Sequence, residues 1–250
     1  MGEAMSGTAA APTARVLSVS RVVPSLAPAE RAGVGHVKLS FLDVPWIKLT
    51  PIQRVFLYEL PGNGDEFSEV VARLKESLAA TLALYLPLAG KLARVADTGD
   101  FFVDCCSDLR VAFVEVEVAE GAVDVRRLAG DEALDVSAFH GLVPKLDARA
   151  LPAPVLSVQA TRLGAGGLAL GLSVLHAVVN GAALWQFTEA WATASREGSP
   201  VINILGPPHS LCKKSSTGII SPQSNGNTAR HFYCVIILNR KVTGVSPSPM

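Results

Sequence analysis

The sequence predicts a mixed α/β fold, because segments with the two-residue period of a strand alternate with segments that have the three-to-four-residue period of a helix. Of its 250 residues, 49% are hydrophobic and 18% are charged, so the chain has enough apolar side chains for a sizeable core. These proportions exclude global disorder. A chain of this length holds one large domain or two small ones.

The first predicted elements are a strand and an amphipathic helix. Residues 36–42 alternate between apolar and polar side chains, as a half-buried strand does, and Pro45 ends this pattern. From Glu69 to Tyr85 the apolar residues instead recur at steps of three and four, which predicts a helix with one buried face. Asp65 or Ser68 is expected to cap the start of this helix.

Further strands are predicted in the middle of the chain. Residues 101–103 and 111–118 have the composition of strands, whereas prolines interrupt 119–153, which we interpret as loops and short helices. Residues 155–162 alternate again, and 168–176 form a second strand whose bulky apolar face ends at His176. The opposite face of this second strand carries only small side chains, namely Ala169, Gly171 and Ser173.

The glycine-rich segment at 164–167 joins the last two strands. Together with Leu168 and Ala169 it satisfies the G-x-G-x-x-G/A pattern of dinucleotide-binding folds, but that pattern must open a helix and a strand follows here. We therefore expect a β-hairpin. The segment "GLSVL" (171–175) lacks the final glycine of a hydrolase nucleophile elbow, so Ser173 is not expected to be a nucleophile.

Beyond about residue 199 the pattern is lost, because Pro, Gly, Ser and Asn are scattered throughout and only 233–238 has the composition of a strand. The sequence therefore predicts a flexible N-terminus at 1–14, a folded domain at 15–198 and a divergent, poorly structured tail at 199–250.

Charge and cysteine usage exclude several classes of protein. Basic and acidic residues balance at 22 each, so no overall field directs the chain to nucleic acid or to an anionic membrane. No stretch approaches the ~18 apolar residues of a membrane-spanning helix, and no signal peptide is evident, so a cytoplasmic protein is expected. The four cysteines contain no C-x-x-C pair, and the five histidines do not cluster at metal-ligand spacing. Reduced cysteines and no metal site are therefore predicted.

His176 stands where the period changes from that of a strand to that of a helix, since a helical pattern follows Gly181. Two interpretations stay open. A histidine at the end of an apolar strand is commonly a structural residue. At the mouth of a strand, with a ring nitrogen facing a cavity, it can instead be a general base that removes a proton from a hydroxyl or an amine. Asn180 suits the N-cap of the following helix.

The segment "HAVVNG" (176–181) resembles the HxxxDG signature of the plant acyl-CoA-dependent BAHD acyltransferases, with Asn180 where the family has Asp. The resemblance covers about residues 15–198. The opening phrase "VLSVSRVVPSLAP" is similar to the branch that acylates anthocyanins and other phenolic glucosides, with malonyl or hydroxycinnamoyl groups. Other phrases that resemble the family, in the same order, are "FLDVPW" (41–46), "RVFLYELP" (54–61), "LYLPLAGKL" (84–92), the segment 155–181 and "WATASR" (191–196).

This resemblance implies a chloramphenicol-acetyltransferase-like α/β fold, in which a mixed sheet packs against helices. It implies that His176 is the general base and that the deprotonated acceptor attacks the thioester of acyl-CoA directly. Acyl-CoA and a small-molecule acceptor are then the partners, with no permanently bound cofactor, and the residues that bind coenzyme A are not identified. The family Asp is structural and pairs with an arginine of the second domain, so Asn180 would have a structural role. The full-length family enzyme is expected to be a monomer.

The sequence also departs from the family, whose second domain carries a DFGWG motif and much of the coenzyme A site. No such motif occurs here. We therefore expect the N-terminal domain alone, a truncated form followed by an unrelated tail. Two alternatives to catalysis stay open: an inactive partial domain that acts as a binding or interaction module, and a non-functional truncated product, since half a core leaves a large apolar surface exposed.

Overall fold

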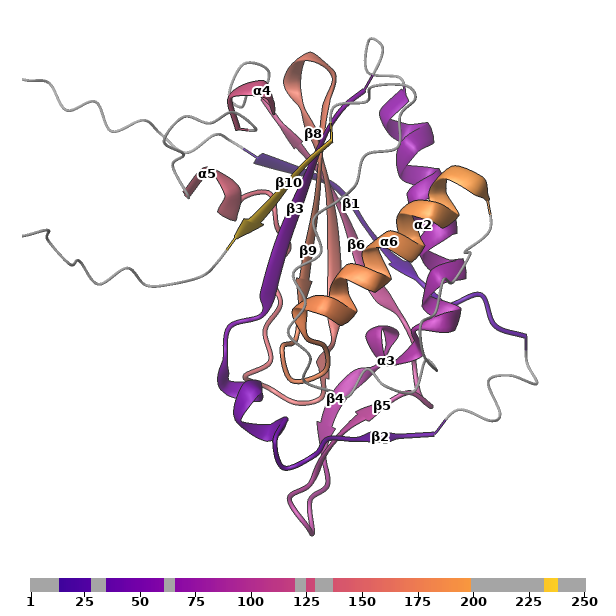
Figure 1. Cartoon of the computed structure of the whole chain (residues 1–250), viewed down its shortest axis with the longest axis vertical. Coiled ribbons are helices and arrows are strands. Elements are labelled where there is room, and N and C mark those ends of the chain that lie inside the picture. Colours follow the sequence, from indigo (N-terminus) through magenta and orange to yellow (C-terminus); the bar gives the residue numbers. More distant parts are fainter. Residues whose placement is uncertain are drawn as a thin grey trace, which may run out of the picture.

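The computed structural model of the chain describes residues 14–27, 35–60, 66–119, 125–128, 137–198 and 232–237. These residues form a six-stranded sheet and a four-stranded sheet, with two long helices against one face of the larger sheet (Figure 1). The α/β architecture predicted from the alternating periods is confirmed.

The larger sheet has the strand order β1-β6-β8-β9-β3-β10. Neighbouring strands are antiparallel except β6 and β8, which are parallel, so the sheet is mixed as expected. β8 and β9 form the predicted hairpin through the short turn at Gly164–Gly166, and no helix opens at Gly167, which excludes the dinucleotide-binding pattern. The strands are β1 (Ala14–Val22), β3 (Ile52–Glu59), β6 (Val111–Val118), β8 (Leu156–Leu163), β9 (Gly167–Val174) and β10 (Phe232–Ile237).

The smaller sheet is antiparallel and has the order β2-β5-β4-β7. Figure 1 shows it beyond one end of the larger sheet, at the bottom of the view. Its strands are β2 (Val37–Lys38), β4 (Lys91–Arg94), β5 (Phe101–Asp104) and β7 (Ala153–Pro154).

The prediction of a strand over the whole of 36–42 is wrong, because only the two residues of β2 pair with a neighbour. Phe41 is 88% exposed, so it does not share a buried face with Leu39. The cause is local side-chain chemistry: a carboxylate oxygen of Asp43 accepts hydrogen bonds from the backbone N–H (3.0 Å) and the hydroxyl (2.6 Å) of Ser40. This contact turns the chain into the 3-10 helix η1 (Val44–Lys48).

The helix predicted from Glu69 to Tyr85 is present as α2 (Glu66–Leu84), followed by the short helix α3 (Leu86–Ala89). The buried residues of α2 include Val71, Leu78 and Leu82, which belong to the predicted apolar face. Ser68 lies inside the first turn and is therefore not the cap, whereas Asp65 lies outside the described residues.

Helix α6 (Gly181–Glu197) lies beside α2 across the same face of the larger sheet (Figure 1). The indole N–H of Trp191 donates to the carbonyl oxygen of Leu74 (3.1 Å) and to the hydroxyl of Ser77 (3.0 Å), which fixes the two helices against each other. Tyr85 contacts Phe187 of α6, and burial, together with the nearby Glu189 carboxylate, raises the pKa of its phenol. Tyr85 therefore packs as a neutral side chain.

The opposite face of the sheet is covered by the short helices α4 (Val125–Leu128) and α5 (Ser137–His140) and by the segment 141–144. This segment crosses β8 and β9 where their side chains are small or polar. Ser173 donates to the carbonyl oxygen of Pro144 (2.6 Å), and Gln159 donates to that of Gly141 (2.8 Å). The loops and short helices predicted for 119–153 are thus confirmed where they are described.

The predicted flexible start at 1–14 and the tail at 199–250 lie almost entirely outside the described residues. The exceptions are Ala14, which begins β1, and β10, which matches the strand predicted at 233–238 to within one residue. β10 pairs antiparallel with β3. Among the described helices, none has the length and apolar character needed to cross a membrane.

Gly171→Ala should lower the free energy of unfolding by about 1–3 kcal/mol, the usual cost of overpacking a core. A Cβ at Gly171 would lie 2.0 Å from the carbonyl oxygen of Leu142, so the segment that covers β9 would have to move. Urea denaturation followed by circular dichroism measures this change. Gly141→Ala is the matched control, because nothing lies within 4 Å of a Cβ there. Equal effects of the two substitutions would contradict this packing.

Candidate active site

His176 lies in the turn between β9 and α6, two residues past the end of β9. The prediction that it is the last residue of the strand is therefore wrong. At the end of β9, Val174 pairs with Ile52 of β3 and with Leu156 of β8. β3 begins at Ile52, because the preceding residue, Pro51, has no N–H to donate to a neighbouring strand. The chain then turns, with the N–H of Val178 donating to the carbonyl oxygen of Leu175 (3.1 Å).

The imidazole of His176 is half-buried and stacks on the indole of Trp46, which η1 contributes. The two ring centroids are 4.4 Å apart and the rings are inclined by 23°. Nδ1 is buried and has no hydrogen-bond partner among the described residues. The side chain as a whole is only partly exposed, so Trp46 and the buried Nδ1 fix how the ring sits in the turn.

Asn180 is the N-cap of α6, and its extended backbone (φ −94°, ψ 174°) is typical of that position. Its side-chain oxygen accepts a hydrogen bond from the N–H of Ala183 at 2.8 Å. The cap fixes where α6 begins, and so it also fixes the length of the turn that carries His176.

Two further polar residues reach this end of the sheet from β3. Gln53 lies opposite Ser173 of β9, and its side-chain nitrogen is 3.4 Å from the Ser173 hydroxyl. In the part of the chain that the structure describes, three buried side-chain atoms have no hydrogen-bond partner: Gln53 Oε1, Arg54 Nε and His176 Nδ1. Such atoms are uncommon in native proteins. Their occurrence where β3 begins and β9 ends marks this region as the candidate site.

Arg54 is a buried cation, with 8% of its surface exposed. Its guanidinium donates to the carbonyl oxygen of Gly181 (3.4 Å) and lies 5.9 Å from the ring centroid of Trp185, so it contacts the first turn of α6. No carboxylate among the described residues pairs with it. Arg54 was not among the residues predicted for the site, although a charged residue on the same strand face as the apolar Phe56 was a usable signal. Trp46 and Gln53 were missed as well.

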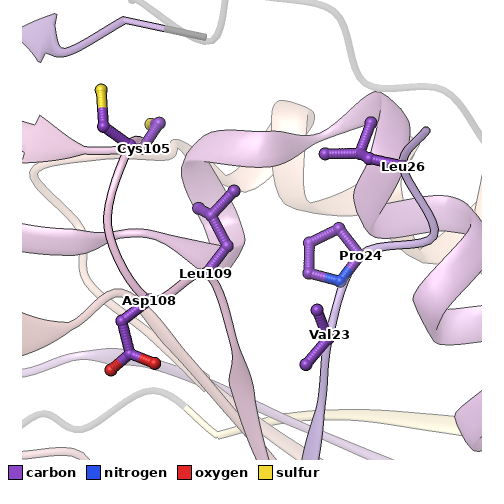
Figure 2. A pocket seen from close by; sticks show the side chains of 7 residues that line it. Val23, Pro24, Leu26, Cys105, Asp108 and Leu109 are labelled. Carbon is purple, nitrogen blue, oxygen red and sulfur yellow. The ribbon is translucent and has the colours of Figure 1, made fainter. Parts of the chain in front are cut away.

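A pocket of about 260 Å³ lies elsewhere, between the segment after β1 and the loop after β5 (Figure 2). It contains none of the residues around His176, so it does not identify a coenzyme A site. Its lining consists of Val23, Pro24, Leu26, Cys105, Cys106, Asp108 and Leu109.

Comparison with known proteins assigns the family. A family model described as the Transferase family matches residues 17–214. The malonyl-CoA:anthocyanidin 5-O-glucoside-6''-O-malonyltransferase of Arabidopsis thaliana is 32% identical over 211 residues, which are 84% of this chain and 44% of that protein. Phenolic glucoside malonyltransferase 1 of the same plant is 33% identical over 181 residues, or 71% of this chain and 37% of that protein. The chain belongs to the BAHD family of acyl-CoA-dependent acyltransferases.

Solved structures agree with this assignment at the level of the fold. Vinorine synthase superimposes with a TM-score of 0.59 at 23% identity, over 77% of this chain and 45% of that chain. The complex of F. graminearum TRI101 with ethyl coenzyme A gives 0.50 at 15% identity, over 68% and 40%. The chloramphenicol-acetyltransferase-like fold expected for a BAHD chain is therefore confirmed. The chain spans less than half the length of the curated relatives it matches.

Asn180→Ala should lower the free energy of unfolding by about 0.5–2 kcal/mol, because it leaves the N–H of Ala183 without its acceptor. Asn180→Asp should preserve stability, since a carboxylate caps as well as an amide and interacts favourably with the helix dipole. Thermal and urea denaturation of the two variants provide the comparison. If the alanine variant were as stable as the parent, the cap would not be holding the start of α6.

Proposed function

We propose that this chain carries the general base of an acyl transfer in which a malonyl or hydroxycinnamoyl group moves from acyl-CoA to a hydroxyl of a phenolic glucoside or related plant metabolite. The observation that carries the proposal is the setting of His176. Its ring lies on Trp46 with Nδ1 buried and without a partner, and the surrounding residues match the family signature except at Asn180. The similarity to curated malonyltransferases of anthocyanidin and phenolic glucosides supports this class of substrate.

In the proposed reaction, Nε2 of His176 accepts the proton of the acceptor hydroxyl. A neutral imidazole has one N–H and one lone-pair nitrogen, so the ring proton then resides on Nδ1. The acceptor oxygen attacks the thioester carbonyl of acyl-CoA, and a tetrahedral oxyanion forms. Its collapse breaks the C–S bond, and the coenzyme A thiolate takes the proton from the imidazolium. Such a base contributes about 10²–10⁴-fold to the rate.

Trp46 and Asn180 act in this proposal as positioning residues. The stack on Trp46 limits rotation of the imidazole, and the cap by Asn180 fixes the turn that carries it. Asn180 stands where the family has Asp, and we assign it a structural role, because its side-chain oxygen is engaged with the backbone of α6.

A general base alone does not make an efficient transferase, since bringing two bound reactants together contributes up to roughly 7–11 kcal/mol of the barrier. The residues that flank η1 in the sequence include exposed apolar side chains, with Phe41 at 88%, Leu42 at 73% and Leu49 at 50%. We infer that the complete site also needs the portion of the family enzymes that this chain does not match. A cytoplasmic, monomeric complete enzyme is part of the proposal.

The 250-residue chain alone should show little or no turnover of malonyl-CoA with a phenolic glucoside. Addition of the unmatched C-terminal portion of an Arabidopsis malonyltransferase should produce transfer, measured as acylated glucoside by mass spectrometry. In that mixture His176→Ala should lower the rate by about 10²–10⁴-fold, whereas Asn180→Asp without the added portion should not produce activity.

His140→Ala is the matched control, because His140 is an exposed histidine on α5, and it should leave the rate unchanged. Strong turnover by the chain alone, abolished in His176→Ala, would show that this chain catalyses acyl transfer without the added C-terminal portion. Transfer that does not depend on His176 would reject it as the base. A mixture that binds malonyl-CoA without turning it over would instead favour the inactive binding module.

A further inference from the structure

Three side chains with metal-binding atoms gather at the edge of the smaller sheet, away from the acyl-transfer residues. His36 precedes β2, Asp104 ends β5, and Cys106 follows two residues later. β2 pairs with β5 so that Val37 lies opposite Val103, and this register places His36 opposite Asp104. Residues directly opposite in an antiparallel pair share one face. One ligand atom from each of the three side chains lies within 4.8 Å of the other two.

The distance between the imidazole and the carboxylate matches that between two ligands of a single zinc ion, and the thiol lies near both. His36 Nδ1 is 3.4 Å from Asp104 Oδ1, and Cys106 Sγ is 3.9 Å from His36 Nδ1. Zinc bonds of about 2.0–2.1 Å to nitrogen, 2.0–2.2 Å to oxygen and 2.3 Å to sulfur in a tetrahedron require separations of about 3.4 Å for nitrogen and oxygen and about 3.5 Å for nitrogen and sulfur. The nitrogen–oxygen separation already fits, whereas the thiol would have to approach both other ligands, since the three atoms are spread over up to 4.8 Å.

The surrounding hydrogen bonds hold the carboxylate in place. Asp104 Oδ1 accepts from the backbone N–H groups of Cys106 (2.9 Å) and Ser107 (3.2 Å), and Oδ2 accepts from the Ser107 hydroxyl. The ring of His36 packs edge-on against Phe102, with centroids 4.8 Å apart. Contacts of this kind orient ligands in established metal sites.

Neighbouring cations do not compete for this carboxylate. Lys38 pairs with Asp100 (2.7 Å), and Lys91 pairs with Asp108 (2.6 Å). Cys105, by contrast with Cys106, is buried with 1% of its surface exposed, so it belongs to the core. The three groups are one imidazole, one carboxylate and one thiol, a combination that suits zinc and not magnesium or calcium.

We propose that His36, Asp104 and Cys106 bind one zinc ion, with the fourth position open to water. The ion would tie β2, an edge strand of two exposed residues, to the loop after β5. The pocket in Figure 2 borders the same loop and includes Cys106 in its lining, and Cys106 is exposed. His36 and Cys106 are 70 residues apart, so spacing along the sequence gave no signal of this site. The proposal is independent of acyl transfer.

The test uses the untagged full chain, prepared without metal and titrated with zinc chloride by isothermal calorimetry. One equivalent should bind, and the melting temperature should rise with zinc. Loss of a residue that merely orients a ligand weakens metal binding about 10–100-fold, so Ser107→Ala should have an effect in that range. Cys106→Ser and His36→Ala remove ligands and should weaken binding by at least about 100-fold. With cobalt(II), the parent should show a thiolate charge-transfer band that Cys106→Ser lacks.

Two controls should retain the site. Asp100→Asn changes the aspartate that directly precedes β5 and pairs with Lys38, and the double substitution Cys212→Ser/Cys234→Ser removes the two cysteines farther along the sequence. Circular dichroism without zinc shows whether each variant is folded. The proposal is overturned if the parent binds no zinc, if a folded Cys106→Ser or His36→Ala variant binds as tightly as the parent, or if the double cysteine variant loses binding.

Discussion

The close contact between the segment 141–144 and the small face of β9 is the constraint on which the rest of the structure depends. All eight residues of β9 are buried, so both faces of this strand are covered. On one face Gly171 leaves room for the carbonyl oxygen of Leu142, while Leu170 and Leu172 on the other belong to the core beneath the helices. A slip of one residue would turn leucine side chains toward the backbone of 141–144. The register of β9 is therefore tightly specified, and so is the position of its end.

The location of His176 follows from that register. Because β9 ends at Val174 and Asn180 caps α6, only a short turn separates the two elements, and the imidazole has little freedom along the chain. The polar atoms of Gln53, Arg54 and His176 that are buried without partners each cost about 1–3 kcal/mol. A stable core normally avoids this cost, and its concentration at one end of the sheet is the pattern of a site whose groups meet a substrate or a further part of the protein.

Much of this fold could be predicted from periodicity, and the failures have particular physical causes. The patterns located α2, α6 and the β8–β9 hairpin because those elements bury regular faces. The strand at 36–42 was predicted too long, since a hydrogen bond from Ser40 to Asp43 overrides the alternation of apolar residues. Local patterns carry no information on contacts between distant segments, so the stack of Trp46 on His176 could not be predicted.

Only part of the candidate site could be predicted from the sequence. His176 was selected through the resemblance of 176–181 to a family signature, and its role as the base stays a prediction. Arg54 and Gln53 were not selected, because their position near His176 depends on strand pairing between β3 and β9. Asn180 shows what the departure from the family changes. An amide and a carboxylate have the same shape and cap a helix equally well, so the geometry of the turn is kept. What the substitution removes is a negative charge near the start of α6, where the buried guanidinium of Arg54 also lies. The difference at position 180 is therefore one of electrostatics and not of fold.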